Sequence, residues 1–107
     1  MPGARATYRP EVPDDVESIL DYLAEHDTAA AERFRLAVPL TIDDLLRFPG
    51  MGSPKDYGEP HLVGMRTWRI RGFPNYLIYY VRVTDGILIH AIMYGARDIG
   101  AILRGRA

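Results

Sequence analysis

Hydrophobic residues in the first half of the chain recur with the period of an α-helix. Two stretches, 12–26 and 27–48, carry apolar residues three or four positions apart, which places those residues on one side of a helix. We expect Asp27 or Thr28 to cap the second helix, and Pro39 to kink or break it, because proline lacks the N–H that a helix interior needs. The apolar residues are Val16, Ile19, Leu20 and Leu23 in the first stretch, and Phe34, Val38, Ile42, Leu45 and Leu46 in the second.

The second half alternates apolar and polar residues, which is the pattern of β-strands. Three strands are predicted, and a tight turn over residues 84–86 joins the last two as a hairpin. The last strand is apolar on nearly both faces, so we expect it to be central in the sheet. The strands cover 66–71, 76–83 and 87–94; a short strand at 6–10 precedes the helices, 50–64 is a Gly- and Pro-rich loop, and 95–107 forms a turn and a short helix or tail.

The order of these elements predicts an α+β fold. An N-terminal strand comes first, a two-helix hairpin follows, and the hairpin packs on an antiparallel β-sheet. A chain of 107 residues is long enough to bury one hydrophobic core, so we interpret residues 1–107 as a single domain.

Composition narrows the possible functions. The chain has no cysteine, which excludes disulfides, thiol catalysis and cysteine-ligated zinc. It has no apolar stretch long enough to cross a bilayer, and its N-terminus lacks the apolar core of a signal peptide. These features favour a cytoplasmic protein without a membrane partner.

Charge divides the chain into two halves. Residues 1–50 carry five Lys/Arg against ten Asp/Glu, whereas residues 51–107 carry eight against four. This asymmetry indicates either separate faces for separate partners or a solvated acidic helix beside an ordinary sheet.

The predicted sheet is rich in arginine. Arg69 and Arg71 are two residues apart on one predicted strand, so we expect their side chains to leave the same face about 7 Å apart. Trp68 and Ile70 then face the opposite side, toward the core. Two guanidinium groups at this spacing suit phosphates or carboxylates, although a polar sheet face explains the same pattern.

Other polar residues carry weaker signals. The three histidines, His26, His61 and His90, lack metal-ligand spacing, so neither a metal site nor a cofactor is predicted. His90 lies among apolar residues, and we expect it to be partly buried and hydrogen-bonded. Asp98 is expected to cap a last helix, with Arg97 supporting the end of the sheet. The adjacent acidic pairs Asp14/Asp15 and Asp43/Asp44 are interpreted as solvated helix charges.

Three segments resemble a known protein family. "MRTWRIRGFPNYLIYY" (65–80) and "IMYGARD" (92–98) carry the resemblance, and "ESILDYLAEHDTAAAERF" (17–34) matches the family's helical hairpin. The chain is similar to the ParE branch of the RelE/ParE superfamily of bacterial type II toxin–antitoxin systems. The resemblance covers most of the chain and implies the fold expected above.

The resemblance implies a toxin, of the kind associated with plasmid stabilization, that acts in one of two ways. ParE-like members poison DNA gyrase without being enzymes, and RelE-like members cut mRNA on the ribosome. This sequence has Leu77 where the nuclease branch has an arginine, and roughly Leu103 where that branch has a C-terminal tyrosine or histidine. The absence of this arginine and of a C-terminal acid or base favours gyrase inhibition. Ribonuclease activity remains the alternative, with Tyr94 or His90 as the substitute acid or base. A non-toxic binding protein on the same fold is a further alternative.

The same resemblance implies partners and contact residues. The expected partners are a ParD-like antitoxin of the ribbon-helix-helix type and DNA gyrase, without sequence-specific DNA binding by this chain alone. The expected contacts with target or antitoxin are Arg69, Arg71 and Arg97, with Arg66, Tyr80, Arg82, His90 and Tyr94 as auxiliary positions.

Overall fold

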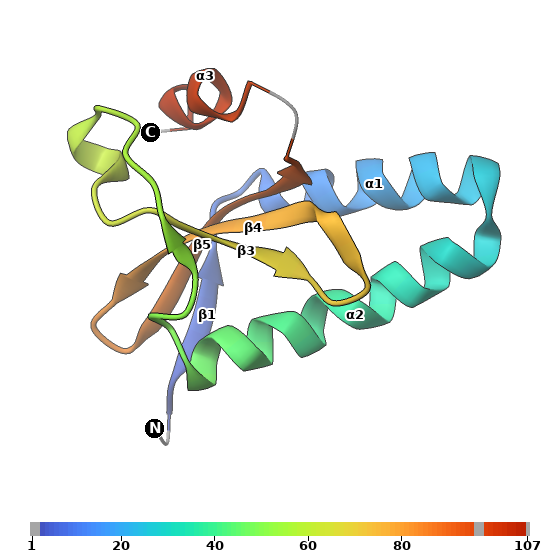
Figure 1. The fold of residues 1–107 in the computed structure, drawn as a ribbon, viewed down its shortest axis with the longest axis horizontal. Helices are drawn as coiled ribbons and strands as arrows, with labels where there is room; N and C mark the ends of the chain where they lie inside the picture. Colours follow the sequence, from blue (N-terminus) through green and yellow to red (C-terminus); the bar gives the residue numbers. More distant parts are fainter. Residues whose placement is uncertain (1–2, 96–97, 107) are drawn as a thin grey trace.

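The computed structural model describes residues 3–95 and 98–106, and it places two long helices on one face of a five-stranded sheet (Figure 1). This arrangement confirms the predicted α+β fold. The elements are β1 (Arg5–Tyr8), α1 (Val12–His26), α2 (Thr28–Arg47), β2 (Ser53–Pro54), the 3-10 helix η1 (Pro60–Leu62), β3 (Arg66–Ile70), β4 (Phe73–Val83), β5 (Gly86–Tyr94) and α3 (Ile99–Arg104).

The sheet has the strand order β1-β5-β4-β3-β2. The meander β3–β4–β5 is antiparallel as predicted, but β1 pairs parallel with β5, so the sheet is mixed. β5 is an inner strand between β1 and β4 and is buried along most of its length, as its apolar composition predicts. The start of β5 requires a glycine at position 86, because a Cβ on Gly86 would overlap the carbonyl oxygen of Arg5 on the neighbouring strand.

The helical hairpin forms largely as its sequence predicts. Asp27 caps α2, and its Oδ1 accepts hydrogen bonds from the backbone N–H groups of Ala29 (2.9 Å) and Ala30 (3.2 Å). The expected break at Pro39 is wrong, because α2 runs from Thr28 to Arg47 without interruption. Pro39 is exposed, and the buried residues of the helix on either side keep the turn packed on the sheet. Within the described residues, no helix has the length and apolarity to cross a membrane.

Apolar residues form two clusters, one on each face of the sheet. The larger cluster lies between the hairpin and the sheet, with Phe34, Leu45 and Ile78 fully buried. The second cluster lies on the opposite face, which the sequence analysis left uncovered. There α3 supplies Ile99 and Leu103, and η1, in the segment predicted as a loop, supplies Leu62. The same segment forms the two-residue strand β2 at the edge of the sheet. We call this face of the sheet the α3 face.

Candidate functional site

The pairing register determines which residues share the α3 face. Arg69 lies opposite Leu77, which lies opposite Met93, so these three form one row across β3, β4 and β5. Leu77 and Met93 belong to the cluster under α3, and Leu103 from α3 is fully buried in the same cluster. Arg69 is therefore the one charged residue of a row that is otherwise apolar. It is exposed, and its guanidinium carbon lies 4.8 Å from the centroid of the Trp68 ring.

Arg71 does not share a face with Arg69, so that prediction is wrong. The strand ends at Ile70, where its register with β4 shifts, and Arg71 follows in the turn. Its Nε and Nη2 donate to the carboxylate of Asp44 on α2 at 2.8 and 2.6 Å. These hydrogen bonds hold the pKa of Asp44 below its usual value. The pair ties the β3–β4 turn to α2, and Asp44 is not the solvated charge that was expected.

Arg66 and Tyr80 hold the segment after α2 against the sheet. Nη1 of Arg66 donates to the carbonyl oxygens of Gly50 (3.0 Å) and Gly52 (2.7 Å). The Tyr80 hydroxyl donates to the carbonyl of Pro49 at 2.8 Å and accepts from the N–H of Gly52 at 3.0 Å. Burial raises the pKa of Tyr80, so the hydroxyl stays protonated. In this structure both side chains are occupied with folding contacts.

His90 is buried more completely than expected. It is the extra residue where the β4–β5 register shifts, and only 1% of it is exposed. Its Nδ1 has no hydrogen-bond partner among the described residues, so the expected hydrogen bond at this atom is absent. Burial, together with the neighbouring charges of Arg9, His61 and Arg106, lowers the pKa of His90 to about 4. A neutral, buried imidazole does not reach a substrate at the surface.

The remaining predicted residues lie apart from Arg69. Tyr94 pairs with Tyr76 in register on the hairpin side of the sheet, and the two ring centroids are 5.6 Å apart. Arg82 is exposed near the end of β4. Arg97 lies outside the described residues. Asp98 caps α3 as predicted, accepting from the N–H of Ala101 at 3.3 Å.

One buried ion pair was missed in the sequence. Nη1 and Nη2 of Arg106 each donate to the carboxylate of Asp15 at 2.7 Å, and Nη1 also donates to the carbonyl of His90 at 3.1 Å. Asp15 accepts a third hydrogen bond from the N–H of Ile92 at 3.1 Å. The interpretation of Asp15 as a solvated charge is therefore wrong. Its place between Val12 and Ile19 on the apolar side of the helix is the signal that the sequence offered.

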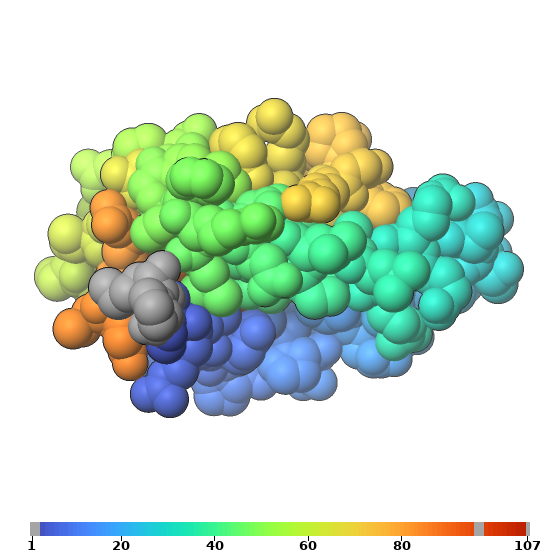
Figure 2. Space-filling view, turned by 90° about the horizontal axis from the view of Figure 1, so that it is seen from below, coloured from blue at the N-terminus to red at the C-terminus, as the bar shows by residue number. Residues whose placement is uncertain are grey.

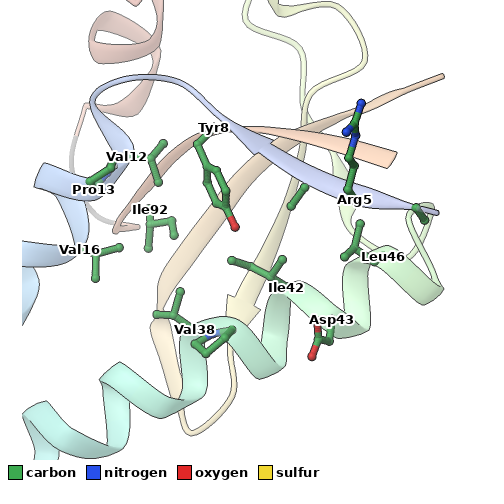
Figure 3. Close-up of a pocket in the computed structure, with 13 residues that line it drawn as sticks. Arg5, Tyr8, Val12, Pro13, Val16, Val38, Ile42, Asp43, Leu46 and Ile92 are labelled. Atoms are coloured by element: carbon green, nitrogen blue, oxygen red, sulfur yellow. The ribbon is translucent and has the colours of Figure 1, made fainter. Parts of the chain in front are cut away.

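An apolar groove lies beside β1 (Figure 3). The two helices diverge from the hairpin end, and β1 lies in the opening between them (Figure 1). The groove has a volume of about 630 Å³. The Tyr8 ring reaches from β1 toward Ile42 on α2, and Tyr8 is 50% exposed. The other side chains around the groove are mainly apolar, and those labelled in Figure 3 include Val12, Val16, Val38, Leu46 and Ile92.

The groove opens on a side of the molecule that α2 dominates. Figure 2 shows α2 crossing this side, with the N-terminal residues of the described chain running alongside it. The free edge of β1 adds unpaired backbone groups to the apolar walls, since β1 pairs only with β5. This side therefore offers both apolar area and a strand edge. In the described part of the chain, no group of three His, Asp or Glu side chains has the arrangement of a metal site.

Comparisons with known proteins agree with this architecture. A family model described as "ParE toxin of type II toxin-antitoxin system, parDE" matches residues 7–99. A solved structure titled "Chromosomal ParDE TA system from P. aeruginosa" contains a similar chain, with a TM-score of 0.67 and 14% sequence identity. The match covers 86% of this chain and 96% of that chain. No curated protein matches the sequence.

Proposed function

The chain belongs to the ParE toxin family of type II toxin–antitoxin systems, and we propose that it inhibits DNA gyrase by binding it, without cutting RNA. In the proposed mode of action, the toxin poisons gyrase so that cleaved DNA accumulates. A ParD-like antitoxin neutralises the toxin by occupying its exposed apolar surface.

One observation carries the proposal against ribonuclease activity. Cleavage of an RNA phosphodiester by the adjacent 2′-hydroxyl needs a base for that hydroxyl, cations for the phosphorane and an acid for the leaving 5′-oxygen. The row that contains Arg69 continues with Leu77 and Met93, and Leu103 of α3 is buried against the same face. No acid, base or second cation stands in that row. His90 is buried, and Tyr94 lies on the hairpin side, so neither substitutes there.

The groove beside β1 supports the antitoxin part of the proposal. A recess of about 630 Å³ between β1, α1 and α2 suits the apolar side of an amphipathic segment. Tyr8 is the large exposed side chain at its centre (Figure 3). Partly exposed tyrosines at interfaces often contribute about 2 kcal/mol or more to binding.

The toxic activity is tested by induced expression in cells without antitoxin. We expect a DNA-damage response and no early arrest of translation. Arg69→Ala should reduce this response while the protein stays folded, because a solvated arginine usually contributes within about 0.5 kcal/mol to stability. Translation arrest with defined mRNA cuts, and no DNA damage, contradicts the proposal.

Antitoxin binding is tested with variants of the groove. Tyr8→Ala should weaken antitoxin binding by roughly thirtyfold, the equivalent of about 2 kcal/mol. The matched control is Val63→Ala, which truncates a 77% exposed residue outside the groove. Equal affinities of the two variants in calorimetry would place the antitoxin elsewhere.

A further inference from the structure

A second recess lies further along α1 and is lined by tyrosines. Tyr22 from α1, Tyr76 from β4 and Tyr94 from β5 surround it, with Ser18 and Ile19 as the remaining wall. We call it the tyrosine recess. Its volume is about 350 Å³, which is the scale of one long side chain or a small ligand and not of a helix. It shares no residue with the groove beside β1.

The walls of the tyrosine recess are held in place. Tyr76 packs edge-on against Phe34 at 5.4 Å and against Tyr94 at 5.6 Å between ring centroids. Tyr22 packs against the His26 ring at 4.8 Å, and the carbonyl of Tyr22 lies 3.0 Å from Nδ1 of His26. Tyr22 and Tyr94 are 56% and 43% exposed, so both rings remain open to a partner.

The hydroxyl group of Tyr76 lies near those of Tyr22 and Tyr94. Burial raises the pKa of Tyr76, and the neighbouring hydroxyls of Tyr22 and Tyr94 raise it further. The Tyr76 hydroxyl therefore stays neutral, and the recess presents three aromatic rings. No lysine or arginine lines it.

The surroundings of the tyrosine recess are acidic. Asp14, Asp21 and Glu25 lie three or four residues from Ser18 or Tyr22 along α1, so they share one side of the helix with the recess. All three are exposed, and none forms an ion pair within the described part of the chain. This side of α1 thus carries negative charge that the fold leaves unpaired.

We propose that the tyrosine recess binds the side chain of a lysine or arginine from a basic segment of a partner protein. Ring faces attract an ammonium or guanidinium group, and attraction to several rings and to nearby carboxylates adds to this preference. An anionic group could accept hydrogen bonds from the hydroxyl groups of the recess, but the carboxylates on this side of α1 would repel it. An apolar side chain would fill the recess but gain nothing from the charge of α1.

The proposal is tested by NMR titration of the whole chain with short capped peptides. One peptide carries a single lysine, a second carries norleucine at that position, and a third carries glutamate. We expect the lysine peptide to shift the ring resonances of Tyr22, Tyr76 and Tyr94 with millimolar affinity. The norleucine and glutamate peptides should shift them much less.

Variants separate ring chemistry from shape. Tyr94→Phe keeps a ring face and should retain binding, whereas Tyr94→Leu should lower the affinity by about three- to thirtyfold. Asp21→Asn should weaken binding and reduce its dependence on salt, because exposed charges are screened by ions. Tyr8→Leu is the matched control, since it removes an exposed tyrosine from the other recess and should leave the affinity unchanged.

Three results would overturn the proposal. These are equal shifts with the norleucine peptide, equal affinities of Tyr94→Leu and Tyr94→Phe, or no shift of the three rings at saturating lysine peptide. The titration uses neither antitoxin nor gyrase, so its outcome is independent of the toxin function proposed above.

Discussion

The pair between Asp15 and Arg106 gives the sharpest test of how the fold is held together. The two side chains are 7% and 12% exposed, so both charges are removed from water. Arg106→Ala deletes two of the three hydrogen bonds to the Asp15 carboxylate and leaves only the N–H of Ile92. An uncompensated buried charge typically costs about 3–5 kcal/mol.

The expected loss is at the lower end of that range. In this variant the Asp15 carboxylate keeps the hydrogen bond from the N–H of Ile92, so it is not left without a partner. We therefore expect Arg106→Ala to lower the free energy of unfolding by about 3 kcal/mol. For a chain of this length that corresponds to a fall in Tm of roughly 10–15 °C.

Calorimetric melting with a matched control makes the prediction decisive. Arg104→Ala removes the same charge from an exposed position two residues earlier, and should change the stability by about 0.5 kcal/mol or less. A double-mutant cycle with Asp15→Ala should give a coupling of about 1–3 kcal/mol. If Arg106→Ala and Arg104→Ala have the same Tm, the buried pair contributes nothing to stability and the reasoning fails.

Three further variants test individual contacts. The unfolded chain protonates His90 near pH 6.5, whereas the folded chain protonates it only near pH 4. Lowering the pH through this window should reduce the free energy of unfolding of the wild type by roughly 3 kcal/mol. In urea unfolding, the stability of His90→Gln should not show this dependence on pH. Tyr80→Phe should lose about 1–3 kcal/mol in the same assay, because the Pro49 carbonyl and Gly52 N–H lose their partner; an unchanged midpoint would argue against this anchor. Asp44→Ala should lower the free energy of unfolding by about 0.5–1 kcal/mol, because it removes the partner of the half-exposed Arg71. An equal loss in Asp43→Ala, which changes the exposed neighbour, would contradict a contribution from that pair.

Much of the fold could be predicted from local patterns. The period of the apolar residues gives both helices, and the alternation after residue 65 gives the antiparallel meander. The apolar run at 87–94 correctly indicates that β5 is an inner, buried strand, and Asp27 and Asp98 cap the helices that follow them. Each of these features depends on residues close together in sequence.

The failed predictions concern partners that are distant in sequence. Asp44 meets Arg71 across 27 residues, and Asp15 meets Arg106 across 91, so no local pattern reveals either pair. Arg71 was placed on the face of Arg69 because the alternation was extended past Ile70, where the strand ends. The parallel pairing of β1 depends likewise on tertiary structure, because four residues at the N-terminus carry no signal for their neighbour.

The tyrosine recess was also beyond the sequence analysis. Tyr94 was noted as an auxiliary position, but its neighbours Tyr22 and Tyr76 come from other elements. Only the hairpin packing on the sheet brings the three rings to one place. In the sequence, each of the three tyrosines stands among apolar residues, as a tyrosine of any ordinary strand or helix does.

The central claim is that this toxin acts on gyrase and not on RNA, and the direct test uses purified protein without antitoxin. With DNA gyrase and relaxed plasmid, we expect supercoiling to be inhibited and cleaved DNA to accumulate, with a weaker effect from Arg69→Ala. With translating ribosomes, we expect the mRNA to stay intact. Defined mRNA cuts by the wild-type protein, together with unaffected gyrase, would contradict the account.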